Sequence, residues 1–243
     1  MLRTPGISGS TSRARFGSLS IVLPAYNEEN TVEEVVRAGL RELDRRAVPG
    51  EVIVVDDGSW DRTGQVLAGI ADPRVRVRTH RENRGYGAAL MRGIRESRFD
   101  WIFFTDTDLQ FDVRELDRLE AHIEAFDLVV GYRRPRVDAI GRRVNGWAWT
   151  ALQNGLLGLG IRDVDCAFKV FHRRVFEQIG VESKGAFVNG EILARAKAAG
   201  FLIQEVPVTH FPRRAGVPTG SDARVIGRAC WELGRMVGEL RGR

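Results

Sequence analysis

The sequence predicts an α/β fold with a mostly parallel, doubly wound sheet that has helices on both faces. Short, almost wholly apolar segments alternate along the chain with segments whose apolar residues recur at helical spacing. The apolar segments show little polar alternation, as expected for strands that are covered on both faces. The chain has 243 residues, 43% hydrophobic and 28% charged, a composition typical of one globular domain rather than of extended disorder.

The first half of the chain provides five strands with helices between them. The expected strands cover residues 18–24, 51–57, 74–80, 101–106 and 127–132. The first helix follows from the helical spacing of Val32, Val35, Val36, Leu40 and Leu43. Two later helices carry Leu90, Met91 and Ile94, and then Leu116, Leu119 and Ile123. Two successive strands and the helix between them form a β-α-β unit, in which the two strands are parallel.

The second half begins with an arginine-rich insertion at 133–160, whose helical part carries Trp147, Trp149, Leu152, Leu156 and Leu157. Two further strands are expected at 167–173 and 201–208, with a helix around 191–199 between them. We therefore expect a disordered tail over 1–18, one globular domain over 19–222 and a C-terminal amphipathic helix over 223–243.

The charge balance points to phosphate-bearing partners. The net charge is +5, and Lys169, Lys184 and Lys197 are the only lysines among 37 basic residues. Guanidinium groups bind phosphate through a planar bidentate fork, which suits phosphate esters, nucleic acid or anionic lipid. No apolar stretch approaches the roughly 20 residues that span a membrane.

Cysteine usage and the N-terminal segment indicate a cytosolic protein. Cys166 and Cys230 lack metal-like spacing and are expected to be buried thiols in a reducing compartment. The first residues lack the apolar core of a signal peptide.

Three polar motifs directly follow three of the apolar strands. They are PAYNE at 24–28, DDGS at 56–59 and TDTDLQ at 105–110. The carboxyl ends of parallel strands open into one crevice, so these motifs should converge in space. This convergence predicts a single site at that edge of the sheet.

The strongest pair of candidate ligands is Asp106 with Asp108. Two carboxylates one residue apart can share a divalent ion, and hard oxygen ligands suit Mg²⁺ or Mn²⁺. Gln110 adds a third oxygen. The alternative is a pair of solvated acids that cap the helix starting near Asp112. Their position after an all-apolar strand favours the metal site.

The other two motifs suit a nucleoside. Asp56 or Asp57 can accept hydrogen bonds from a base or a ribose hydroxyl, although an ordinary turn with a helix cap is an equally simple role. Pro24 restricts the end of the first strand, Tyr26 can stack on a base, and Glu28 can accept from the nucleotide or favour the helix N-terminus.

Taken together, IVLPAYNEEN, VIVVDDGSWDRT, ENRGYGAAL and TDTDLQ occur in an order that resembles the family 2 glycosyltransferases of A-type fold. The chain is most similar to the dolichol-phosphate mannose synthase and polyprenyl-phosphate glycosyltransferase branch, over Leu19 to about Arg228. The domain at 19–222 is then a catalytic domain. The resemblance implies a metal-dependent, inverting transfer of a sugar from a GDP- or UDP-linked donor to a polyprenyl phosphate.

The resemblance also implies roles for individual residues at the donor end of the site. Asp106, Asp108 and Gln110 match the motif that binds the metal and the donor diphosphate. Positions around the nucleoside are matched by Pro24, Tyr26, Glu28, Asp56, Asp57 and Asp106.

The loop THFPRRAGVPTG places Arg213 near the diphosphate. Pro218 and Thr219 stand where the dolichol enzymes have a Ser-Lys pair, a departure that affects one contact to the leaving group. Arg133, with Arg142 or Arg143, falls where the branch contacts the lipid phosphate.

The residues independently favour a phosphate acceptor. Transfer to a hydroxyl requires a carboxylate base, and the sequence lacks both the Glu-Asp dipeptide common for that purpose and the Gln-x-x-Arg-Trp signature of processive relatives. A phosphate monoester has a second pKa of about 6 and is already ionised at neutral pH. Five arginines can neutralise it, namely Arg133, Arg134, Arg136, Arg142 and Arg143.

The expected mechanism is a single in-line displacement in which Asp108, through its metal, and Arg213 stabilise the departing nucleoside diphosphate. Asp165 and Glu191 can bind sugar hydroxyls, act as the base for a soluble hydroxyl acceptor, or be structural acids. A further alternative is a non-catalytic basic module that binds nucleic acid or membrane. It leaves the ordered motifs unexplained, so we expect no nucleic acid partner.

The lipid acceptor implies contact with the cytoplasmic face of a membrane. The helix at 137–158, with its two tryptophans, is expected to lie on the membrane surface, whereas the terminal helix is expected to pack on the domain. A separate membrane subunit is an alternative means of attachment.

Overall fold

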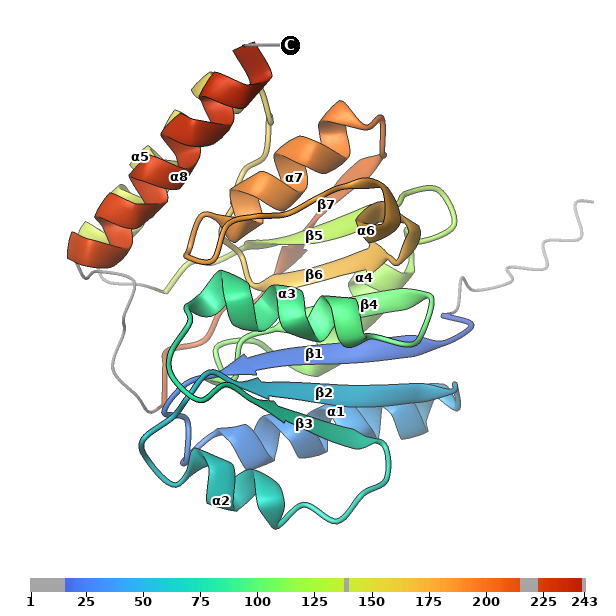
Figure 1. Ribbon diagram of the computed structural model, residues 1–243. Coiled ribbons are helices and arrows are strands. Elements are labelled where there is room, and N and C mark those ends of the chain that lie inside the picture. Colours follow the sequence, from blue (N-terminus) through green and yellow to red (C-terminus); the bar gives the residue numbers. More distant parts are fainter. Residues whose placement is uncertain (1–15, 138–139, 215–222, 242–243) are drawn as a thin grey trace, which may run out of the picture.

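The computed structural model describes residues 16–137, 140–214 and 223–241, apart from the side chains of 142, 223, 240 and 241. Its centre is a seven-stranded sheet in the order β3-β2-β1-β4-β6-β5-β7 (Figure 1). The strands are β1 Leu19–Ala25, β2 Gly50–Asp56, β3 Val75–Thr79, β4 Trp101–Thr105, β5 Leu128–Arg133, β6 Phe168–His172 and β7 Ile203–Val208. Strand β6 runs antiparallel to both of its neighbours, and the other pairs are parallel. The predicted α/β class is confirmed.

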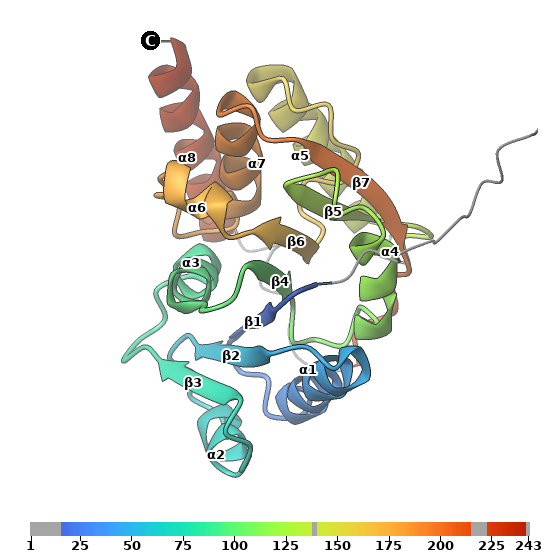
Figure 2. The same cartoon turned by 90° about the vertical axis from the view of Figure 1, so that its right-hand side faces the viewer.

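Helices cover both faces of this sheet (Figure 2). They are α1 Val32–Arg46, α2 Thr63–Ala68, α3 Tyr86–Glu96, the 3₁₀ turn η1 Val113–Glu115, α4 Leu116–Glu120, α5 Ile140–Leu157, α6 Arg174–Gln178, α7 Val188–Ala198 and α8 Ala223–Arg241. Strand β1 illustrates the two layers: Ile21 and Leu23 pack with α1 and α4, whereas Val22 packs with α3 and α7. A strand buried on both faces explains the continuous apolar run seen in the sequence.

Pairing of the central strands brings their carboxyl ends together. Ala25 at the end of β1 is in register with Asp56 at the end of β2. The amide of Asp57 donates to Ala25 O at 2.8 Å, and Thr107 Oγ1 donates to Pro24 O at 3.1 Å. The three polar motifs therefore meet at one edge of the sheet, as predicted.

The N-terminal boundary differs from the prediction. Residues 1–15 of the expected tail lie outside the described part, but Phe16 is buried, and its ring lies 6.0 Å from that of Trp101. Its amide donates to Glu120 Oε1 at 2.9 Å. The buried ring and the hydrogen-bonded amide make Phe16 part of the domain. The predicted tail over residues 1–18 is therefore too long at its C-terminal end.

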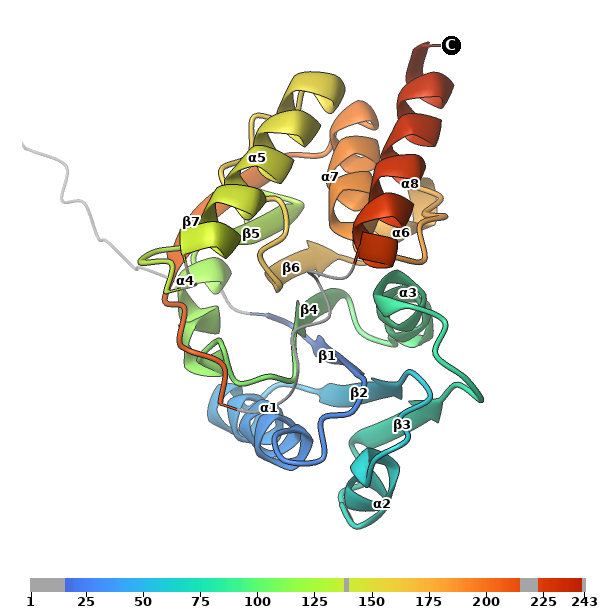
Figure 3. The same ribbon diagram turned by 90° about the vertical axis from the view of Figure 1, so that its left-hand side faces the viewer.

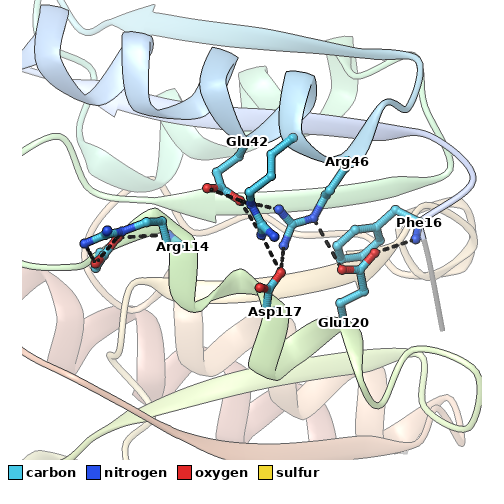
Figure 4. A network of polar contacts seen from close by, with 8 residues as sticks. Phe16, Glu42, Arg46, Arg114, Asp117 and Glu120 are labelled. Carbon is cyan, nitrogen blue, oxygen red and sulfur yellow. Dashed lines mark hydrogen bonds and ion pairs between the residues drawn. The ribbon is translucent and has the colours of Figure 1, made fainter. Parts of the chain in front are cut away.

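A buried ion network holds the same region together (Figure 4). The guanidinium of Arg46 contacts Glu42, Asp117 and Glu120, with distances of 2.6 Å to Asp117 and 3.4 Å to Glu120. Because Arg46 and Glu42 lie on α1 and the other two acids on α4, the network fixes these helices against each other beneath the sheet.

The two long helices of the second half, α5 and α8, lie side by side (Figures 1 and 3). Helix α8 buries Ala229, Leu233 and Met236 in the core, which confirms that it packs on the domain. Cys230 is exposed rather than buried as expected, because the helix turns Ala229 toward the core instead.

Candidate active site

The turn that follows β4 carries the two candidate metal ligands. Tyr86 Oη, from the first turn of α3, donates to Asp106 Oδ1 at 2.9 Å. The Arg213 guanidinium lies 2.7 Å from Asp108 Oδ2, and the amide of Gln110 donates to Asp108 Oδ1 at 3.1 Å. Leu109 between them has a φ of 59°, a left-handed conformation that closes the turn. Both carboxylates are thus held by groups from other parts of the chain.

Burial gives these carboxylates unusual proton affinities. Desolvation, together with the adjacent charge of Asp108, raises the pKa of Asp106 to about 7, and the Tyr86 hydrogen bond opposes the rise. Burial also raises the pKa of Asp108, and the Arg213 charge opposes that rise. Two negative charges close together in a low dielectric create strong demand for a compensating cation.

The donor set fits a hard divalent ion. Two carboxylates one residue apart supply the kind of oxygen ligands that Mg²⁺ and Mn²⁺ prefer, and such ions commonly complete their shell with water and substrate phosphates. In the described part of the chain, no group of three or more His, Cys, Asp or Glu side chains is placed to hold a metal. The protein's share of such a site would therefore be Asp106 and Asp108.

Gln110 makes a different contact from the expected one. Its side-chain amide donates to Phe211 O at 3.2 Å, and the Phe211 amide donates to Gln110 O at 2.9 Å. This pairing fixes the loop that carries Arg213 against the metal turn. Pro218 and Thr219, later in the same loop, lie outside the described residues.

Arg213 connects the turn after β4 to Glu28 in the segment after β1. Besides Asp108, its guanidinium lies 3.5 Å from Glu28 Oε1. The other oxygen of Glu28 accepts from Thr31 Oγ1 at 2.7 Å, and burial raises the pKa of this carboxyl. Tyr26, two residues earlier, is half-buried at the same edge.

The two acids of DDGS have separate roles. Asp57 accepts from the amides of Arg84 at 3.0 Å and Gly85 at 2.8 Å, and its Oδ1 lies 2.6 Å from His80 Nδ1. Asp56 Oδ1 accepts from the Ser59 amide at 2.9 Å. Because the chain itself occupies both oxygens of Asp57, this residue is structural, and Asp56 remains the nucleoside candidate of the pair.

The two expected sugar ligands also differ. Glu191 is buried, accepts from the amides of Glu182 and Ser183, and pairs with Arg195 at 2.7 Å. These contacts make it a structural acid that anchors the loop before α7, which corrects the sugar-binding expectation. Asp165, in contrast, has a buried Oδ1 without a hydrogen-bond partner among the described residues. Burial raises its pKa to about 6, so it remains a candidate for sugar binding.

A buried lysine near Asp106 was missed by sequence reasoning. Lys169 Nζ donates to Asn189 Oδ1 at 3.0 Å, and its charge opposes the burial that raises the pKa of Asp106. Lys169 is completely buried, and burial lowers its pKa. The available signal was a single lysine between the apolar residues Phe168 and Val170 of strand β6.

A pocket of about 580 Å³ lies at the amino-terminal end of α5. Its lining is basic and apolar, and comprises Tyr132, Arg133, Arg136, Ile140, Arg143, Val144, Gly146, Trp147, Thr150, Arg162 and Asp163. Arg133 forms two 2.6 Å contacts with Asp163. The side chain of Arg142 lies outside the described residues. Arg162, which was not expected, joins the pocket from the segment before β6.

The two tryptophans of α5 point in different directions. Trp147 is 71% exposed beside this pocket, whereas Trp149 packs inward with its ring 6.5 Å from that of Phe187. Other exposed apolar side chains line the same helix, namely Ile140, Val144, Leu152 and Leu156. Among the described helices, none is both long and apolar enough to cross a membrane.

Comparison with known proteins agrees with this geometry. Residues 20–180 match the family model described as glycosyl transferase family 2. This chain belongs to glycosyl transferase family 2. The match covers all three polar motifs and strands β1 to β6.

Two curated members of the family are similar to it. Glycosyltransferase AglD of Haloferax volcanii is 35% identical over 80% of this chain, and the chain spans only 33% of that protein. The polyprenol monophosphomannose synthase of Mycolicibacterium smegmatis is 31% identical over 84% of this chain and 82% of its own length.

A solved structure shares the fold. The glucosyl-3-phosphoglycerate synthase of Mycobacterium tuberculosis, determined with Mn²⁺, UDP and its product, superposes with a TM-score of 0.69. It is 24% identical and covers 89% of this chain and 80% of its own. The A-type glycosyltransferase fold expected from the motifs is therefore confirmed.

Proposed function

We propose that this family 2 glycosyltransferase moves a sugar from a nucleoside-diphosphate donor to a polyprenyl phosphate, with inversion at the anomeric carbon. The observation that carries the proposal is the pocket at the start of α5. It combines four arginines, Arg133, Arg136, Arg143 and Arg162, with exposed apolar side chains of the same helix. An acceptor with a phosphate head and a long apolar tail matches both properties.

The donor would bind at the carboxyl edge of β1, β2 and β4. Asp106 and Asp108 would hold Mg²⁺ or Mn²⁺, which when bound neutralises charge on the diphosphate. Arg213 already lies 2.7 Å from Asp108 and is positioned to stabilise charge that develops on the leaving group. Glu28, Asp56, Pro24 and Tyr26 would contact the nucleoside. Gln110 would position the Arg213 loop rather than ligate the metal.

The acceptor needs orientation more than activation. A phosphate monoester is already ionised at neutral pH because its second pKa is about 6, so no protein base has to remove a proton. Arg143 and its neighbours would neutralise the phosphate and aim one oxygen at the anomeric carbon. Asp165 would bind a sugar hydroxyl.

We further propose that the enzyme works at the cytoplasmic face of a membrane. The exposed apolar face of α5 next to the basic pocket is the pattern of an interfacial helix. Two free cysteines suit a reducing compartment. This surface would bring the pocket to the lipid headgroups without a spanning segment, and a membrane partner subunit would serve the same purpose.

A second candidate is transfer to a soluble hydroxyl acceptor, such as the phosphoglyceric acid bound in a structure of the glucosyl-3-phosphoglycerate synthase. The experiment begins with thermal shifts in GDP and UDP, each with Mn²⁺, to select the donor. Radiolabelled donor sugar is then offered with polyprenyl phosphate or with 3-phosphoglycerate. The proposal predicts label in the organic phase, and label that enters only 3-phosphoglycerate would refute it.

A further inference from the structure

A second basic pocket shares no lining residue with the proposed donor and acceptor sites. It has a volume of about 460 Å³ and is bordered by α3, by the loop before α7 and by α8. Its lining comprises His80, Arg84, Gly87, Ala88, Met91, Arg92, Arg95, Val181, Glu182, Ser183, Lys184 and Arg235. No residue of this set lines the pocket on α5. Helices α3 and α8 lie on one flank of the molecule, at the right of Figure 3.

The rim of this pocket has more positive than negative charge. Five cationic side chains face a single acid, Glu182, whose carboxylate is paired with Arg235 at 2.6 Å. Arg92 is paired with Glu96 at 3.1 Å. Within the described part of the chain, no carboxylate pairs with the side chains of Arg84, Arg95 or Lys184.

The pocket is also formed by firmly held backbone. The Ala88 amide of α3 donates to Lys184 O at 3.2 Å, which fixes the two walls against each other. Gly87 is required there, because a Cβ would lie 2.7 Å from Ser183 O. Asp57 holds the Arg84 amide at 3.0 Å. The cations therefore surround a concavity whose shape is defined in the absence of a ligand.

The apolar part of the lining, here called the floor of the pocket, consists of Met91, Ala88 and Val181. Met91 is buried, whereas Arg84 and Arg95 are exposed. Arg235 lies 5.6 Å from the ring of Trp231, which is 66% exposed next to the pocket. An exposed tryptophan beside arginine is typical of protein surfaces at the membrane interface.

We propose that this pocket is a second anion site, which binds the phosphate group of a phosphate ester whose organic part rests on the apolar floor. Arg84, Arg95 and Lys184 would contact the phosphate, since they are the cations that no carboxylate neutralises. The phosphate comes either from an anionic phospholipid headgroup or from a soluble phosphate ester. The exposed Trp231 favours the lipid.

The test uses a double variant, Arg95→Ala with Lys184→Ala, and a matched control, Arg37→Ala with Arg41→Ala, which removes two exposed arginines from α1. Calorimetric titration with pyrophosphate in the presence of EDTA measures binding directly. We expect the double variant to bind pyrophosphate about tenfold more weakly than the wild type. The control variant and Arg213→Ala should both retain pyrophosphate binding at this pocket. Equal affinity of the double variant and the wild type, or complete loss of binding in Arg213→Ala, overturns the proposal.

A second arm distinguishes the two sources of phosphate. Sedimentation with phosphatidylcholine vesicles is compared with and without phosphatidylglycerol. If the double variant loses the phosphatidylglycerol-dependent part of vesicle binding and the control does not, the ligand is a lipid headgroup. If vesicle binding is unchanged while pyrophosphate binding falls, the ligand is a soluble phosphate ester.

Discussion

The proposed donor edge and the proposed acceptor pocket are built in opposite ways. At the donor edge, the two candidate metal ligands are held by side chains from distant parts of the chain, Asp106 by Tyr86 and Asp108 by Arg213. Among the described residues that line the pocket on α5, Asp163 is the only acid beside several arginines, and the apolar side chains point to solvent. The first region suits a small ligand of fixed geometry. The second suits a charged head on a long apolar tail.

The largest effect should come from breaking the donor edge. Asp108→Asn removes a carboxylate charge with little change in shape, so we expect turnover to fall on the order of a thousandfold in a radiolabel transfer assay. Asp72→Asn, the same substitution in the turn before β3, serves as the control and should be nearly neutral. Turnover within about threefold of the wild type for Asp108→Asn would show that Asp108 does not hold a metal that the reaction needs.

A change in the acceptor pocket should affect only the acceptor. Arg143→Ala removes an exposed cation from the pocket, and we expect the KM for polyprenyl phosphate to rise about tenfold while the KM for the donor stays constant. Asn145→Ala, on the same helix but outside the pocket lining, is the matched control. An equal rise in both KM values would show that the two regions are not separate.

A finer test of the donor edge concerns the group that positions Asp106. Tyr86→Phe keeps the ring and removes the hydroxyl that donates to Asp106 Oδ1. We expect Mn²⁺ affinity, measured by calorimetry on the purified protein, to weaken about threefold to tenfold because the carboxylate loses its orientation. Phe104→Leu, a change in the core behind the site, controls for packing loss. Unchanged Mn²⁺ affinity in Tyr86→Phe would show that the Tyr86 hydroxyl does not orient Asp106 for metal binding.

The smallest effect is on stability as a function of pH. The pKa of Asp106 is raised from 3.8 to about 7 in the folded protein, so the folded state binds an extra proton between these values. The contribution of Asp106 to the free energy of unfolding is therefore fully present below about pH 4 and is lost as the pH rises through 7. Urea unfolding of the metal-free proteins should show the wild type losing stability relative to Asp106→Asn as the pH rises from about 4 to about 7. A pH-independent difference in the free energy of unfolding between the two proteins would contradict the shift.

Sequence reasoning succeeded where a local pattern determines the outcome. Apolar runs such as β1, β2 and β4 can pair only inside a covered sheet, so their carboxyl ends had to converge. Asp56 lies at the end of β2, and Asp106 and Asp108 follow β4. The resemblance extended this to Arg213, which does lie against Asp108.

Sequence reasoning failed to predict the partners of side chains whose contacts are determined by tertiary packing. The sequence gives no sign that Asp57 binds the amides of Arg84 and Gly85, or that Glu191 anchors the loop before α7. Lys169 was overlooked because its partners are backbone carbonyls and Asn189, which approach it only after folding. Phe16 is buried against Trp101 and Arg46, and its amide donates a hydrogen bond to Glu120, contacts that no periodic pattern in the sequence indicates.

The central claim is that the acceptor is a lipid phosphate, and one measurement tests it directly. The same polyprenyl chain is supplied as its phosphate and as its free alcohol, with Mn²⁺ and the radiolabelled donor that the thermal-shift panel selects. We expect label to enter the lipid only when the phosphate is present, because the pocket provides cations, and Asp163, the carboxylate among its described lining residues, is already paired with Arg133. Comparable transfer to the alcohol, or no transfer to either lipid, would contradict the account.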